Sequence, residues 1–128
     1  MKKITYLFFT LLLLTSCNAD EAALKSLNGR WNWVNSSGGI AGTTNTPQST
    51  NKTIVLEFKD FTKKTYVNDK LTDEVTFTIE TRESIMGGNR KMIIITGGVT
   101  QTFVIEGNRL YLSDECYDCF QSSYKRIK

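Results

Sequence analysis

One pair of residues has a spacing that suggests chemistry: Cys116 and Cys119, separated by Tyr117 and Asp118. Two cysteines this close form a disulfide, act as a redox couple, or supply two of the four ligands of a zinc ion. Redox chemistry requires a cysteine whose pKa is lowered at a helix N-terminus, whereas these two lie between expected strands. Zinc would need two further ligands, and the chain has no histidine. We therefore expect a structural disulfide, no metal and no other cofactor.

Three carboxylates, Asp114, Glu115 and Asp118, flank the cysteines and suggest the paired acid and base of a hydrolase. Such residues more often belong to a solvated turn. The absence of histidine also removes the Ser-His-Asp and Cys-His pairs of nucleophilic catalysis. We therefore predict that the protein is not an enzyme and has no catalytic residue, with thiol redox chemistry as the remaining enzymatic alternative.

The first residues predict an export signal that ends in a lipid attachment site. Two lysines follow Met1, and residues 4–14 are almost entirely apolar. This run is too short to cross a bilayer, which takes roughly 20 residues, but it suits the apolar region of a signal peptide. Residues 14–17, Leu-Thr-Ser-Cys, resemble the lipobox of bacterial lipoproteins. The resemblance implies that residues 1–16 are removed and that Cys17 is lipidated.

This resemblance implies a protein anchored in the cell envelope. A diacylglycerol on the sulfur of Cys17 and a further acyl chain such as palmitate on its amino group would hold it stably, because more than one chain is present. Asn18 follows the cysteine in place of an aspartate, which favours the outer membrane and leaves the leaflet open. Loss of the signal lowers the formal net charge from +3 to +1, so we expect no nucleic-acid partner.

The remaining residues have the length of one domain. Residues 17–28 read as a lipidated tether with a short helix over 20–27, because acidic residues begin that helix and Asn28-Gly29 end it. Residues 29–128 are rich in valine, isoleucine and threonine, which suit strands better than helices. This composition predicts a domain made almost entirely of β-structure.

Short segments of alternating polarity, separated by turn residues, predict eight strands. Eight sequential strands suffice to close an antiparallel up-and-down barrel with room for side chains or one small ligand. An open β-sandwich is the alternative fold. The expected strands cover residues 30–35, 52–59, 62–67, 72–81, 90–96, 99–106, 109–113 and 121–127. The lysines at 63 and 64 are expected to be exposed charges that favour solubility.

Gly29 and Trp31 begin the first expected strand, and Arg126 lies in the last one. A Gly-x-Trp motif at this place resembles the first motif of lipocalins and other calycins. The resemblance implies that Trp31 closes one end of the barrel and that Arg126 packs over its ring in a cation–π contact.

Most of residues 27–127 is similar to small lipocalin-like lipoproteins of Gram-negative bacteria, whose function is largely uncharacterised. A further sequence block of true lipocalins is missing, so their ligand preferences transfer poorly. The similarity rests on residues 27–34, 36–42, 46–47 and 110–114, on Cys116 and on the final Tyr-x-Arg.

Residues 36–50 are rich in glycine, serine, threonine and asparagine, and they predict a long loop without regular structure. In a calycin the loop after the first strand overhangs the open mouth of the barrel. We consider two roles for it, a flexible surface loop and a lid. As a lid, it would place Ile40 in the mouth.

The leading hypothesis is a monomeric binding module for a small apolar or amphipathic ligand. The alternative is a filled barrel that acts as a protein-interaction module, either a subunit of an envelope complex or a hydrolase inhibitor, with exposed side chains such as Tyr117 and Phe120. The residues expected to line the ligand site are Ile40, Leu56, Phe58, Tyr66, Phe77, Ile79, Ile94, Phe103 and Leu112.

Overall fold

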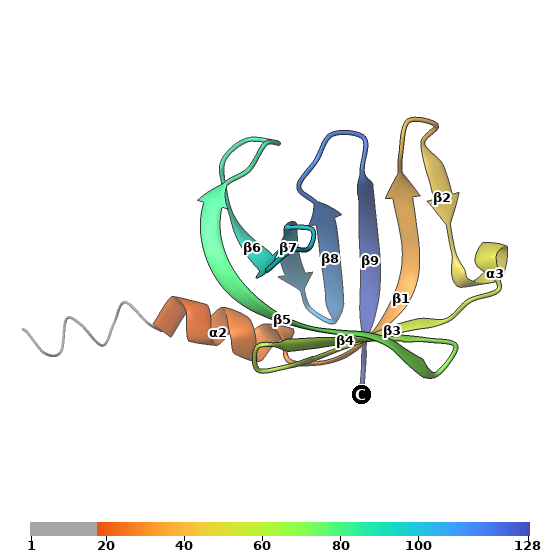
Figure 1. The fold of residues 1–128 in the computed structure, drawn as a ribbon, viewed down its shortest axis with the longest axis horizontal. Helices are drawn as coiled ribbons and strands as arrows, with labels where there is room; N and C mark the ends of the chain where they lie inside the picture. The colour runs from red at the N-terminus through yellow and green to blue at the C-terminus, as the bar shows by residue number, and fades with distance from the viewer. Residues whose placement is uncertain (1–17) are drawn as a thin grey trace, which may run out of the picture.

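The structure is a computed structural model that describes residues 18–128, so the signal peptide and Cys17 lie outside the described residues. Its elements, labelled in Figure 1, are α2 (Asn18–Leu27), β1 (Gly29–Gly38), β2 (Thr43–Asn45), α3 (Pro47–Thr50), β3 (Ile54–Lys59), β4 (Thr62–Val67), β5 (Lys70–Glu83), β6 (Asn89–Ile95), β7 (Gln101–Glu106), β8 (Arg109–Asp114) and β9 (Phe120–Ile127). Within residues 18–128, no helix is both long and apolar enough to cross a membrane.

Eight of the strands form a closed antiparallel barrel, as the sequence predicts. Strands β3 to β9 pair in chain order, and β1 joins the two ends because it pairs with both β3 and β9. The ninth strand, β2, pairs with the end of β1 alone and lies outside the barrel.

Strand β1 bends, so that it pairs with β3 on one side of the barrel and with β9 on the other. Its first residues, Gly29–Asn32, pair with β3, and a register shift between Trp33 and Asn35 follows. Figure 1 shows the result: β3 and β4 cross beneath the upright strands β8, β9 and β1.

The hydrophobic core fills the lower part of the barrel, where these two halves meet. Trp31 pairs with Leu56 across β1 and β3, so both side chains point inward. The rings of Phe58 and Phe77 meet edge to face with centroids 5.7 Å apart. The buried core residues are Leu27, Trp31, Trp33, Leu56, Phe58, Phe77, Ile79, Ile93, Phe103, Leu110, Leu112 and Tyr124.

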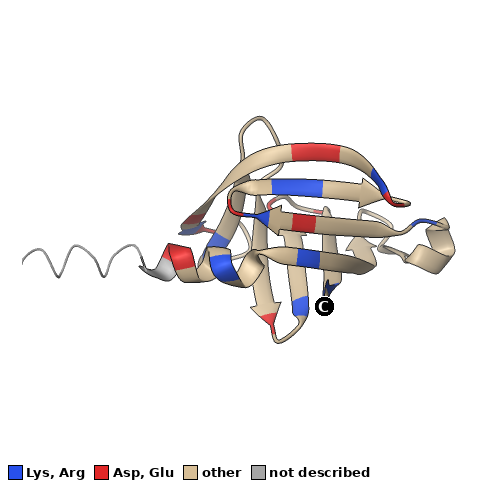
Figure 2. Ribbon diagram, turned by 90° about the horizontal axis from the view of Figure 1, so that it is seen from below, with Lys and Arg blue, Asp and Glu red and all other residues tan. Residues whose placement is uncertain are grey.

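Alternating charges cover the outer face of the strands that cross beneath. Figure 2, seen from below, shows basic and acidic bands following one another from strand to strand. Arg30 on β1 lies 3.7 Å from Glu57 on β3, and Lys64 on β4 lies 3.9 Å from Glu74 on β5. Opposite charges on directly facing residues favour this strand register.

The prediction of an irregular loop over residues 36–50 is wrong. β1 continues to Gly38 because its last residues pair with both β9 and β2. The short helix α3 then begins at a capping box in which Thr46 and Ser49 exchange side chain–backbone hydrogen bonds, with a proline at its first position. The segment is therefore a hairpin followed by a helical turn.

Gly38 allows β1 to pack closely against the β8–β9 turn. A Cβ at this position would collide with the carbonyl oxygen of Cys119 and lie 2.9 Å from the Cα of Phe120, and the φ of Gly38 is +143°. Gly42 also has a positive φ, +64°, but nothing lies within 4 Å of the position of its Cβ.

We expect Gly38→Ala to lower the free energy of unfolding by about 2–3 kcal/mol, because β1 and the turn must separate. Gly42→Ala is the control for backbone strain alone and should cost about 1 kcal/mol. Urea unfolding of both variants measures the difference. Equal losses would mean that the contact with the β8–β9 turn is unimportant.

Candidate functional site

The closed end of the barrel is fastened by Arg126. Its guanidinium carbon lies 4.1 Å from the ring centroid of Trp31, a close cation–π contact. Its two terminal nitrogens donate hydrogen bonds to the backbone oxygens of Asn28 and Ser26, at 3.0 and 2.6 Å. The indole nitrogen of Trp31 donates to the backbone oxygen of Leu27 at 2.9 Å.

The structure thus brings Gly29, Trp31 and Arg126 together. A Cβ on Gly29 would lie 3.0 Å from a guanidinium nitrogen of Arg126. This close approach explains why strand β1, which carries Trp31, begins with a glycine. Because the bonded oxygens belong to the end of α2 and the residue after it, the same arginine also holds the helix against the barrel.

Six of the nine residues proposed to line a ligand site belong to the packed core. They are buried and contact one another, so they leave little surface for a ligand; they are Leu56, Phe58, Phe77, Ile79, Phe103 and Leu112.

The other three residues point away from the interior, and their placement inside was wrong. Ile40 is 95% exposed at the tip of the β1–β2 hairpin, since the segment folds outward and not over the mouth. Tyr66 pairs with Val55 on the outer face, where Arg30 lies 5.9 Å from its ring. Ile94 pairs with the exposed Thr78, while its neighbour Ile93 occupies the core.

Above the core, the inner face of the barrel is polar. Strand registers place seven polar side chains on this inner face. Each of them either pairs with an inward-facing residue of the neighbouring strand or lies two residues from one along its own strand. All of these residues are at least partly accessible to solvent. We call them the inner polar layer: Ser36, Lys63, Thr65, Asp73, Gln101, Asp114 and Ser122.

Lys63 is the main departure from the expected exposed charges. It pairs with Phe58 on one side and Val75 on the other, and this places its side chain inside. Burial lowers the pKa of its ammonium group, and the charges of Asp73 and Asp114 counteract only part of that shift. Among residues 18–128, nothing lies close enough to form an ion pair or a side-chain hydrogen bond with it.

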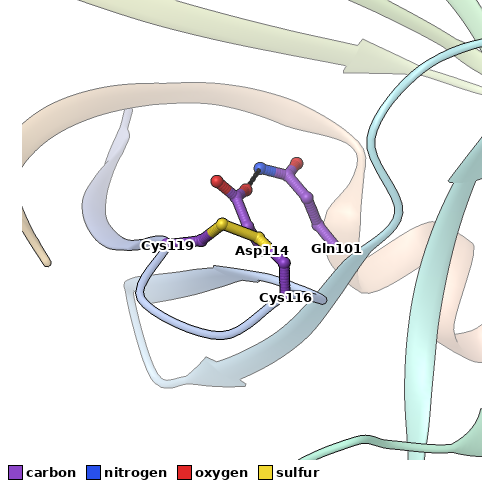
Figure 3. The surroundings of a disulfide bond; sticks show 4 residues. All are labelled: Gln101, Asp114, Cys116 and Cys119. Carbon is purple, nitrogen blue, oxygen red and sulfur yellow. Dashed lines mark hydrogen bonds between the residues drawn. A yellow bond between two sulfur atoms is a disulfide. The ribbon is translucent and has the colours of Figure 1, made fainter. Parts of the chain in front are cut away.

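Asp114 and Gln101 face one another across β7 and β8, and Figure 3 shows them beside the disulfide. The side-chain nitrogen of Gln101 donates to a carboxylate oxygen of Asp114 at 2.7 Å. The side-chain oxygen of Gln101 is buried and, among the described residues, has no hydrogen-bond partner. A buried acceptor without a donor is costly, so this atom lowers the stability of the folded chain.

A hydrogen-bonded chain supports the layer from the β1–β9 side. The indole nitrogen of Trp33 donates to the hydroxyl of Ser36 at 2.8 Å, and that hydroxyl lies 2.6 Å from the hydroxyl of Ser122. Tyr124 is buried next to them, and burial raises its pKa to about 12. These contacts fix the two serines in place.

Glu115 holds three turns together, two of which, β5–β6 and β8–β9, lie along the upper edge of Figure 1. Its carboxylate accepts from the Ser84 hydroxyl and the Ile85 backbone, and its own backbone N–H donates to Thr100. Glu115 therefore joins three turns and is a positioning residue. The sequence alone indicated only a solvated carboxylate.

The disulfide between Cys116 and Cys119 is confirmed, with Cα atoms 5.7 Å apart. Its loop lines a pocket of about 420 Å³ together with residues of β1, β6, β7, β8, β9 and the β5–β6 turn. Asp114 is the one residue that this pocket shares with the inner polar layer. Thr102, Ser113 and Gln121 line it from positions that alternate with Gln101, Asp114 and Ser122, so much of the pocket lies on the opposite face of these strands. No group of histidines, cysteines and carboxylates in residues 18–128 could hold a metal ion.

Apolar side chains stand exposed around this pocket. Met86 and Phe120 line it and are 56% and 40% exposed. Tyr117, in the disulfide loop, is 72% exposed, and Ile85 and Val99 are exposed in neighbouring turns. We call these exposed apolar side chains the apolar rim.

Comparison with known proteins identifies a lipid attachment site at the start of the chain. A family model described as the prokaryotic membrane lipoprotein lipid attachment site matches residues 1–18. No curated protein and no solved structure matches the chain. The protein is therefore a lipid-anchored lipoprotein of the cell envelope with an eight-stranded barrel, a fold consistent with the lipocalin-like resemblance.

Replacing Arg126 should show how much the closed end depends on it. We expect Arg126→Met to lower the free energy of unfolding by about 2–3 kcal/mol, through loss of the cation–π contact and two hydrogen bonds to a charged donor. Lys125→Met, an exposed neighbour on the same strand, should change it by less than about 0.5 kcal/mol. Denaturant unfolding compares the two, and similar values would contradict the assigned role.

Tyr124 should make stability depend on alkaline pH. Its pKa is raised from 10.0 to about 12, so the unfolded chain ionises first and stability falls between these values as pH rises. The loss should reach about 2–3 kcal/mol. Unfolding measured from neutral pH to pH 12 tests this, with Tyr124→Phe expected to flatten the decline. An unchanged decline in that variant would assign the effect elsewhere.

Proposed function

We propose that the protein binds a small amphipathic molecule at the open end of its barrel, with the polar group in the inner polar layer and the apolar part along the rim. The observation that carries this proposal is an inward-facing lysine, Lys63, that has no ion-pair or hydrogen-bond partner among the described residues. The pocket of about 420 Å³ has a volume typical of small-molecule sites.

A buried charge without a partner supports binding because it costs stability in the free protein. Natural sequences retain such groups mainly at functional sites, where a ligand supplies the missing interaction. Replacement of Lys63 by an apolar residue of similar length would relieve this cost. The polar layer contains no nucleophile with an adjacent base, so binding, and not catalysis, is the activity that we propose.

We also propose that the anchor lies in the outer membrane and that the protein is a monomer. The membrane assignment rests on the asparagine at position 18. The barrel supports a monomer, since within residues 18–128 its closure leaves only the short strand β2 as an edge for pairing with another chain.

An interaction with another protein is the second candidate function. Ile40 and Tyr117 favour it because they are highly exposed and neither one lines the pocket. A partner would have to cover them both. Cross-linking in native membranes, compared between the wild type and Ile40→Ser/Tyr117→Ser, would detect a partner that depends on this patch.

Lys63→Met separates ligand binding from folding. We expect the variant to be more stable than the wild type by about 1 kcal/mol at neutral pH. The pKa of Lys63 is lowered, so the gain should shrink as pH rises toward 10.5, where the unfolded chain also loses its charge.

The same variant should lose the ligand. Native mass spectrometry of both proteins, purified from the producing cell, should find a small molecule on the wild type and a strongly reduced amount on Lys63→Met. Lys125→Met, which removes an exposed lysine, should retain it. A stabilised variant that carries as much ligand as the wild type would refute the role of Lys63, and a wild type without ligand would refute the binding function.

A further inference from the structure

The lipid attachment site is followed almost directly by folded structure. The matched family model covers residues 1–18, and Cys17 is the only cysteine in that range. Helix α2 begins at the next residue, Asn18, and strand β1 begins at Gly29. Only the ten residues of α2 and Asn28 therefore lie between the lipidated cysteine and the barrel.

The C-terminal half of α2 is fixed to the barrel. Leu27 is completely buried, and Leu24 packs against the same core. Arg126, on strand β9, donates hydrogen bonds to the backbone oxygens of Ser26 and Asn28, at 2.6 and 3.0 Å. The helix is therefore held from within the core and from β9, and its two ends are about 15 Å apart.

The N-terminal half of α2 lies beside the β5–β6 hairpin. A carboxylate oxygen of Asp20 is 3.7 Å from the ammonium nitrogen of Lys91 on β6, and the helix also contacts β5. Even a fully extended chain from Cys17 to Asp20 would span at most about 11 Å. Figure 1 shows α2 and this hairpin at one end of the long axis of the molecule and α3 at the other end.

The hairpin continues past the barrel core on the side of Lys91. Ile79 is the last core residue of β5, which is 14 residues long. Beyond it, two residue pairs share the same face, and all four side chains are polar and at least partly accessible to solvent. We call these residues the hairpin face: Thr81 with Lys91, and Glu83 with Asn89.

The lipid brings the hairpin face to the membrane surface. Acyl chains enter the hydrocarbon core, so their attachment point lies in the polar head-group layer, which is about 5–7 Å thick on each side. Because Asp20 follows this point closely and contacts Lys91, the hairpin face must lie near the same layer. Its polar and charged side chains suit hydrated head groups and would be costly to bury in hydrocarbon.

We infer that the hairpin face and the first residues of α2 form a membrane-contact surface that packs on phospholipid head groups. The α3 end of the molecule then points away from the bilayer. Lys91 is the central residue of this surface, since its ammonium group has three donors and can bind a lipid phosphate while it faces Asp20. The inference uses the lipid anchor and the fold, so it holds whether or not the barrel binds a ligand.

The test compares the distances of two positions from the head groups in the full lipidated protein. The protein is reconstituted in vesicles of phosphatidylethanolamine and phosphatidylglycerol that contain a small fraction of a nickel-chelating lipid. Thr81→Cys and Gln48→Cys each add one free thiol for a nitroxide label, because Cys17 is lipidated and the other two cysteines form the disulfide. Electron paramagnetic resonance measures how strongly the nickel shortens the relaxation time of each label.

We expect strong relaxation of the label at position 81 and little at position 48, which is exposed on α3. The matched control has a flexible linker inserted between Asn18 and Ala19, so that Asn18 stays next to the lipidated cysteine. A linker of about 20 glycine and serine residues lets the anchor and the helix separate by about 25 Å. The label at position 81 should then lose most of its relaxation.

Three outcomes would contradict the inference. Equal relaxation at positions 81 and 48 without the linker would mean that the barrel has no preferred side toward the membrane. Stronger relaxation at position 48 would place the opposite end of the molecule on the head groups. Unchanged relaxation at position 81 after insertion of the linker would mean that the docked helix does not set the orientation. Both labelled positions are exposed, so circular dichroism should show wild-type folding.

Discussion

The whole barrel depends on the pairing of its first and last strands, which Arg126 secures over Trp31. This contact joins strand β9, strand β1 and the end of helix α2 at one point. The stacked indole and guanidinium seal one end of the barrel, and the hydrophobic core packs above them. Along β1 the inward residues run from Trp31 through Trp33 to Ser36, so the core separates the Ser36–Ser122 part of the inner polar layer from this contact.

The sequence predicts most of the fold because strand periodicity and turn residues are local signals. Seven of the expected strands fall within about two residues of the observed ones, and the Gly-x-Trp motif marks the strand that closes the barrel. The extension of β1 to Gly38 was missed because one of its pairing partners, β9, lies more than 80 residues away in the chain. The signal for α3 was present in the Thr46–Ser49 capping box and the proline between them.

The candidate site could not be predicted in the same way, since it depends on which face each strand turns inward. Met92 to Ile95 is an unbroken apolar run without alternation, so the choice between Ile93 and Ile94 requires the register with β5. In β4 the aromatic Tyr66 suggests an inward face, yet pairing with β3 turns Lys63 and Thr65 inward. Two adjacent lysines give no indication that one lies inside and the other outside.

The closure of β1 on β9 also sets the order in which the protein can mature. The pairs between these strands join residues about 90 positions apart, and such distant contacts make folding slow. A chain exported with its N-terminus leading exposes Trp31 long before Arg126 arrives. The barrel therefore closes only after nearly the whole chain has been exported, and until then its apolar strands lack their final partners. Folding is thus coupled to the end of translocation.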